Sequence, residues 1–254
     1  MNYNFNKKVA LVTGSSRGIG LSIGLALYEM GCVVILNSRN IKDLKIILNG
    51  KNSRLLAIDA DVTKTSGITK IRKFLQKKNL SLDLLICNYG DGKSSVEKTY
   101  DINEWKRVFD INFFSSINVL FEFISDLRKN KGNCLFISSI CGLAALNAPI
   151  PYSVAKSAIN YSVKNLANML GKDGIRINAI SPGNILHKGS VWEKKIIENE
   201  KEVKKMIKNN VPLNKFGSPK DISSAAIFLL SENASFITGS NLVVDGGQLK
   251  TVEV

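Results

Sequence analysis

The chain has 254 residues, of which 44% are hydrophobic, and a formal net charge of +14 at pH 7. This composition suits one large α/β domain with a substantial core, and no apolar run approaches the ~18 residues of a membrane span. The opening sequence MNYNFNKK lacks the apolar core of a signal peptide, so we expect a cytoplasmic protein with no membrane partner.

Short apolar runs alternate with longer helical patterns from one end of the chain to the other. The predicted strands are 9–13, 32–37, 55–58, 82–87, 133–138, 176–180 and 242–244. The predicted helices lie near 18–30, 40–49, 64–78, 103–129, 153–171 and 219–231. Continuously apolar strands are typical of a parallel sheet covered on both faces. The alternation therefore predicts a Rossmann-type, doubly wound sheet of about seven strands in one α/β domain.

One segment, 184–217, interrupts this alternation because it is long and charged. Pro182-Gly183 precedes it, and Phe216-Gly217 ends it. We predict a small substrate lid with its own short helices, inserted in a single catalytic domain that spans residues 1–254.

The basic residues and the cysteines predict neither a nucleic-acid partner nor a metal site. The basic residues are scattered and form no aromatic-and-basic patch, so we expect no nucleic-acid partner. None of the cysteines has the spacing of metal ligands, so we predict no metal site. They lie in or beside apolar runs, where buried thiols behave as small hydrophobic side chains: Cys32, Cys87, Cys134 and Cys141.

A glycine-rich turn, TGSSRGIG at 13–20, follows the first predicted strand and opens a helix. Gly14, Gly18 and Gly20 allow a tight turn and let the backbone approach a pyrophosphate at the helix N-terminus. Because this turn stands between a strand and a helix near the beginning of the chain, it predicts a dinucleotide site.

The end of the second predicted strand bears on the choice of dinucleotide. A site that prefers NAD usually has an acid here for the ribose hydroxyls, and this chain has none between 37 and 40. It has Arg39, with Arg17 in the glycine-rich turn, and guanidinium groups hold a 2′-phosphate through charge-assisted hydrogen bonds. We therefore predict NADP(H) in preference to NAD(H).

Further motifs stand at fixed places along the chain. They are Asp61-Val62, Asn88-Tyr89-Gly90, Asn112, Ser139, Tyr152-x-x-x-Lys156, Pro182-Gly183-x-Ile185 and Val244-Asp245-Gly246-Gly247. With the glycine-rich turn, they resemble the short-chain dehydrogenase/reductase family over nearly the whole chain. The resemblance implies a homotetramer, or a homodimer, built on the helices near 103–129 and 152–171. It also implies cofactor contacts from Gly14, Ser16, Arg17, Gly18, Ile19, Gly20, Arg39, Asp61, Val62, Asn88, Gly90, Tyr152, Lys156, Pro182, Gly183 and Ile185.

The catalytic set implied by the resemblance is Asn112, Ser139, Tyr152 and Lys156. Pro151 suits the first position of a helix, and residues four apart then share one helix face, so Tyr152 and Lys156 lie together. A phenol that works near neutrality needs its pKa lowered by about 3 units, or ~4 kcal/mol, and a nearby ammonium acts in that direction. We expect Tyr152 to transfer the proton, Ser139 to bond the substrate oxygen and Asn112 to place a water near Lys156.

Three departures from the family pattern bear on the substrate. Tyr89 replaces a small residue, His187 stands where the family often has a threonine, and Trp192 lies in a polar lid. Trp192 either caps a ligand or anchors the lid, and His187 either contacts substrate or is a surface residue. Cys141, two residues beyond Ser139, is the fourth candidate for a substrate contact.

Two substrate classes are open. The pattern is similar to that of 3-oxoacyl-carrier-protein reductases, whose acidic partner would suit a basic surface. However, the basic positions with which those enzymes bind the carrier correspond to Asn130 and Asp173. The alternative is a sugar or other polar metabolite, which suits the polar lid. A protein that binds NADP(H) as a sensor or scaffold, without turnover, is a third hypothesis, against which the intact catalytic set argues.

Overall fold

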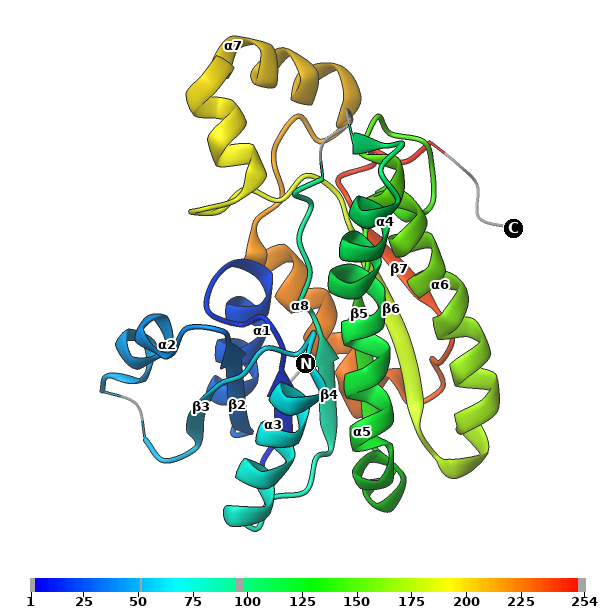
Figure 1. Cartoon of the computed structure of the whole chain (residues 1–254). Helices are drawn as coiled ribbons and strands as arrows, with labels where there is room; N and C mark the ends of the chain where they lie inside the picture. The colour runs from blue at the N-terminus through cyan, green and yellow to red at the C-terminus, as the bar shows by residue number, and fades with distance from the viewer. Residues whose placement is uncertain (1–2, 51, 95–97, 251–254) are drawn as a thin grey trace.

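A computed structural model describes residues 3–50, 52–94 and 98–250. Its centre is one parallel seven-stranded sheet in the order β3-β2-β1-β4-β5-β6-β7 (Figure 1). The strands are β1 Val9–Val12, β2 Val33–Ser38, β3 Leu55–Asp59, β4 Leu84–Cys87, β5 Asn133–Ile137, β6 Arg176–Pro182 and β7 Asn241–Val244. The predicted doubly wound α/β fold is confirmed, because the order reverses direction between β1 and β4.

Helices cover both faces of the sheet. Alternate strand residues explain this, since Leu11 points into one apolar cluster while Ala10 and Val12 point into the other. One face is covered by α3 Thr65–Lys77, α5 Ser115–Asn130 and α6 Ile150–Leu170. The other is covered by α1 Gly18–Glu29, α2 Ile41–Leu48 and α8 Pro219–Leu230.

The helix predicted near 103–129 is interrupted. It consists of α4 Ile102–Phe109, a π-helical turn Asp110–Phe114, and α5. The Asn112 side chain donates to Val108 O (3.1 Å), and Ser115 Oγ donates to Ile111 O (2.7 Å). These two side chains donate to backbone carbonyls of the preceding turn, where the α-helical hydrogen bonds give way to the wider π-helical spacing. Single π-turns inside helices are frequent at functional sites, and this one carries Asn112.

The 29-residue run Ile102–Asn130 is long and apolar enough, by length and composition, to cross a membrane. This differs from the prediction that no apolar run approaches the length of a membrane span. In the structure its α5 part packs on the sheet through Val119, Leu120 and Phe123, all fully buried. The run is therefore a core helix of the α/β fold.

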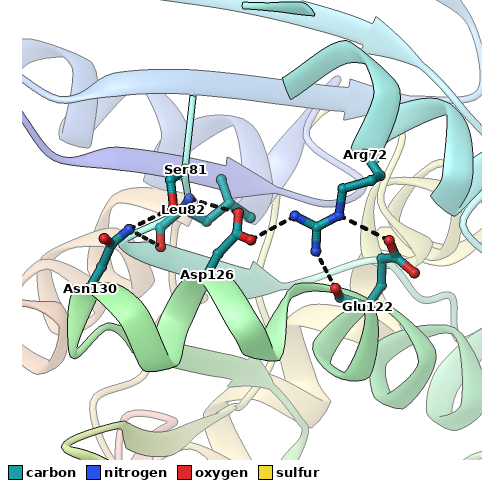
Figure 2. A network of polar contacts seen from close by, with 6 residues as sticks. All are labelled: Arg72, Ser81, Leu82, Glu122, Asp126 and Asn130. Carbon is teal, nitrogen blue, oxygen red and sulfur yellow. Dashed lines mark hydrogen bonds and ion pairs between the residues drawn. The ribbon is translucent and has the colours of Figure 1, made fainter. Parts of the chain in front are cut away.

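A network of polar contacts docks α5 against α3 and the start of β4 (Figure 2). Arg72 of α3 is bound to Glu122 at 3.0 Å and to Asp126 at 2.6 Å, and it also contacts the Glu122 carbonyl. Asp126 accepts a hydrogen bond from Leu82 N (3.1 Å). Because Arg72 is only 19% exposed, these contacts fix α5, and with it the π-helical turn.

As predicted, the segment 184–217 holds its own short helices, which together form α7 Val191–Asn210. Asn199 interrupts it with φ −157° and ψ 82°, so two arms meet at a kink. The helix begins at Ser190, whose hydroxyl accepts from Glu193 N (3.1 Å). In Figure 1, α7 stands away from the sheet at one end of the domain.

Candidate active site

The glycine-rich turn has the geometry that close contact with an anion requires. Gly14 has φ +63°, and a Cβ there would lie 2.9 Å from Tyr89 Cα. The Asn88 amide donates to Thr13 O and Gly14 O, both at 2.9 Å. The Asn88 amide therefore supports the turn, and its role as a cofactor contact stays a prediction. Thr13 supports the turn as well, because its Oγ1 accepts hydrogen bonds from the backbone N–H groups of Asn88 and Tyr89 (3.0 Å each).

The beginning of α1 fits a dinucleotide phosphate. Its N-cap residue, Arg17, makes no side-chain capping bond, and its first turn holds no acid. The N–H groups of that turn and the helix dipole therefore favour an anion. The predicted contacts Ser16, Gly18, Ile19 and Gly20 all lie on this turn.

Three predicted contact residues, Arg39, Tyr89 and Asp61, lie near one another beyond the ends of β2, β4 and β3. Arg39 Cζ lies 5.7 Å from the centre of the Tyr89 ring, and these residues follow β2 and β4, which flank β1. Burial raises the pKa of Tyr89, and Arg39 opposes that rise. Burial acts on Asp61 as well, but hydrogen bonds from Thr63 lower its pKa overall. Val62 is buried beside it.

The candidate catalytic residues meet at the ends of β5 and α6. Ser139 follows β5, and its Oγ accepts a hydrogen bond from Cys141 N (3.2 Å). The Ser139 hydroxyl lies close enough to the Tyr152 phenol to lower its pKa. Lys156, one turn along α6, is 5% exposed and lies 5.9 Å from the centre of the Tyr152 ring. Its Nζ donates to Ile137 O (2.9 Å).

The expectation that Lys156 lowers the pKa of Tyr152 is wrong for this structure. Burial raises the pKa of Tyr152 to about 12, and the Ser139 hydrogen bond only partly offsets it. Burial also lowers the pKa of Lys156 to about 8. The physical reason is that loss of hydration disfavours both charged forms, while the ammonium is directed at the Ile137 carbonyl and not at the phenol oxygen.

Asn112 and Lys156 converge on Gly90. A Cβ at Gly90 would lie 2.8 Å from Asn112 Oδ1 and 3.5 Å from Lys156 Nζ. Asn112 is 1% exposed, and its Oδ1 accepts from Asp91 N (3.0 Å). The side chain of Asn112 thus ties the loop after β4 to the π-helical turn beside Lys156.

The segment 183–190, which connects β6 to α7 of the lid, lies against the glycine-rich turn. A Cβ at Gly18, where φ is +58°, would meet the His187 ring at 2.7 Å. His187 is therefore near the phosphate-binding turn, a place that the sequence pattern did not predict. Ile185 is buried and pairs with Gly217, whereas Pro182 ends β6 and Gly183 packs against Asp245.

Trp192 and Cys141 take different places. Trp192 packs on Phe216 with ring centres 5.6 Å apart, and Lys195 covers it at 4.8 Å, so it anchors the lid. The Cys141 backbone N–H donates to Ser139 Oγ; burial raises the pKa of the Cys141 thiol, and the nearby Ser139 hydroxyl opposes that rise. In the described part of the chain, no group of three or more His, Cys, Asp or Glu residues is arranged as metal ligands.

Comparisons with known proteins agree with this site. A family model described as "Enoyl-(Acyl carrier protein) reductase" matches residues 14–248. Glucose 1-dehydrogenase 2 of Bacillus subtilis is 32% identical over 247 residues, with 94% of each chain covered. The 3-oxoacyl-[acyl-carrier-protein] reductase FabG of Rickettsia typhi is 31% identical, with 97% of this chain and 98% of that protein covered. L-Sorbose reductase of Gluconobacter frateurii, complexed with NADPH and L-sorbose, has a TM-score of 0.91 at 27% identity, with 99% and 100% covered.

The dinucleotide turn and the serine, tyrosine and lysine beside it define an oxidoreductase that acts on alcohol and ketone groups. The chain belongs to the short-chain dehydrogenase/reductase family.

Proposed function

We propose that the protein is an NADP(H)-dependent enzyme that interconverts a ketone and a secondary alcohol, with Tyr152 as general acid and base. The observation that supports this best is the meeting of Ser139, Tyr152, Lys156 and Asn112 beside a turn that fits a dinucleotide phosphate. The bound nicotinamide supplies or accepts the hydride.

The side chains then have separate tasks. In reduction, Tyr152 donates its proton to the carbonyl oxygen, and a phenol with a raised pKa is protonated at neutral pH. The Ser139 hydroxyl donates a hydrogen bond to the same oxygen as negative charge develops there. Lys156, with a pKa of about 8, is charged at neutral pH and would donate hydrogen bonds to the nicotinamide ribose.

The proposed preference for NADP(H) rests on Arg39. Its guanidinium is exposed and lies over the Tyr89 ring, and it forms no ion pair within 4.0 Å with the acids whose side chains are described, in residues 3–40, 42, 44–50, 52–94 and 98–250. Its charge contributes to lowering the pKa of Asp61 without a close ion pair, so the guanidinium remains able to bind a 2′-phosphate.

Substitution Arg39→Ala is expected to weaken NADPH binding by roughly 10- to 100-fold, because hydrogen bonds between charged groups are lost. NADH binding should change little. The measurement is a fluorescence titration of each cofactor, with Lys45→Ala, which removes an exposed charge of α2, as the control. Equal loss for both cofactors would contradict the role of Arg39.

A hydroxylated ketone is the substrate class that we favour. The two positions for binding an acidic carrier are engaged within the chain: Asn130 donates to Ser81 and Leu82, and Asp173 is paired with Arg128 at 2.9 Å. A 3-oxoacyl thioester is the second candidate, because an apolar groove of about 710 Å³ lies along α7. Lys204, Lys208 and Lys215 stand at this groove.

Consumption of NADPH tests the proposed reaction directly. The purified protein is mixed with acetoacetyl thioester in one series and with hydroxylated ketones, including L-sorbose, in another. Turnover with the hydroxylated series supports the favoured class, and turnover with the thioester alone supports the second. NADPH bound tightly without consumption in either series would favour the sensor or scaffold hypothesis.

We also propose a homotetramer, or a homodimer, in the cytoplasm. The supporting observations are an exposed apolar face and four free thiols, which suit a reducing compartment. The apolar face lies on the π-helical turn, α5 and α6: Phe114, Phe121, Ile150, Val154, Tyr161 and Met169. Analytical ultracentrifugation should show an oligomer for the wild type and a smaller species for the double variant Phe121→Glu/Tyr161→Glu. A monomeric wild type would contradict the proposal.

A further inference from the structure

An acidic residue outside the recognised motifs lies beside the proposed proton donor. Asp91 directly follows Gly90, where a Cβ would lie 3.5 Å from Lys156 Nζ, so the chain passes the ammonium just before Asp91. The carboxylate of Asp91 also acts on the phenol: it contributes to raising the pKa of Tyr152 and opposes the lowering of the pKa of Lys156. The same carboxylate also contributes to raising the pKa of Tyr89 and the pKa of Arg107.

The loop that carries Asp91 is fixed in place. Its N–H donates to Asn112 Oδ1 (3.0 Å), and its Oδ1 accepts from Lys93 N (3.2 Å). Arg107 of α4 donates to Lys93 O (2.7 Å) and is paired with Glu104 at 2.8 Å. Glu104 is buried, so the loop backbone is held by α4 and the π-helical turn, and the carboxylate keeps its hydrogen bond from Lys93 N.

The Asp91 carboxylate has acceptor capacity to spare. Over residues 3–50, 52–94 and 98–250, no lysine or arginine nitrogen lies within 4.0 Å of it. An ionised carboxylate offers about four acceptor sites, and the backbone N–H of Lys93 takes one. A half-buried carboxylate is disfavoured beside an alkyl chain and favoured beside a hydrogen-bond donor.

We propose that Asp91 is a specificity-determining residue that selects a substrate with a hydroxyl group on the carbon next to the reacting carbonyl. The inference rests on the proposed function and narrows its substrate to polyol- or sugar-like ketones. A hydroxyl is a better partner than an ammonium, because the charges of Lys156 and Arg107 already interact with the carboxylate. An aliphatic 3-oxoacyl chain places methylene groups against Asp91 and is disfavoured.

Two ketones of nearly the same shape test this inference. Hydroxyacetone and 2-butanone differ in a hydroxyl against a methyl group. Loss of a hydrogen bond to a charged acceptor is expected to lower kcat/KM for hydroxyacetone by roughly 10- to 100-fold in Asp91→Ala, with little change for 2-butanone. Asp91→Asn keeps the size and one acceptor and should fall between. Glu29→Ala, which removes an exposed carboxylate at the end of α1, is the control.

Binding provides a second readout that needs no turnover. Dissociation constants of both ketones are measured by saturation-transfer NMR on the protein saturated with NADP⁺. A preference for hydroxyacetone that disappears in Asp91→Ala supports the inference, even where no NADPH is consumed, in which case the proposed reaction alone fails. Equal binding of the two ketones by the wild type, or a preference that persists in Asp91→Ala, overturns it.

Discussion

Substitution Tyr152→Phe is expected to lower kcat by roughly 10²- to 10⁴-fold, the range of a general acid, while NADPH binding stays within about threefold. The change removes one hydroxyl and leaves the ring to pack in the same half-buried place. No other side chain in the described site holds a proton at that position, since Ser139 interacts with the phenol itself. The measurement is NADPH consumption in stopped-flow and steady-state assays, beside a fluorescence titration of the cofactor.

A matched control is available at another tyrosine. Tyr100 is 100% exposed and lies outside both the site and the apolar face, so Tyr100→Phe makes the same chemical change and should leave kcat nearly unchanged. Turnover by Tyr152→Phe close to that of the wild type would refute the role of Tyr152. Loss of cofactor binding in that variant would show that its effect on rate is indirect.

Most of the fold was predictable because its signals are local. Apolar runs gave the seven strands, and the described strands begin and end within about two residues of the predicted ones. The order of the strands does not follow from those runs, since it depends on which edges pair. The short helices predicted in 184–217 are the two arms of α7, where Ser190 and the Glu200–Lys204 pair, at 2.7 Å, are ordinary helix signals. The π-helical turn was not predicted, because the apolar pattern of 103–129 continues through it without a break.

The candidate site was predictable where residues sit in a motif, and less so where loops meet. Ser139, Tyr152 and Lys156 lie together as their spacing indicated. The approach of His187 to Gly18 depends on how the lid connection crosses the turn, which no local pattern encodes. Asp91 could have been noticed as an acid next to Asn88-Tyr89-Gly90, but its closeness to Lys156 needs the fold. The pKa of Tyr152 was mispredicted, because spacing reveals a neighbouring charge and not the burial that outweighs it.

The buried Lys156 links the chemistry to the stability of the protein. Burial lowers its pKa from 10.5 to about 8, and each pKa unit corresponds to 1.36 kcal/mol. Holding the charged form therefore costs the folded protein about 3 kcal/mol at pH values below 8. Between pH 8 and 10.5 the unfolded chain binds more protons than the folded one, so the free energy of unfolding rises with pH through this window.

Substitution Lys156→Met is expected to remove that rise together with most of the turnover. The variant lacks the buried charge at every pH, so its stability relative to the wild type should fall by about 3 kcal/mol as pH increases through the window. Losing the bond to Ile137 O adds an offset that does not depend on pH. Urea unfolding at pH 7 and pH 10 measures the difference, and shared groups such as Cys32 cancel in it. A difference in the free energy of unfolding that stays constant with pH would contradict the lowered pKa of Lys156. It would mean that burial beside Tyr152 does not destabilise the charged ammonium.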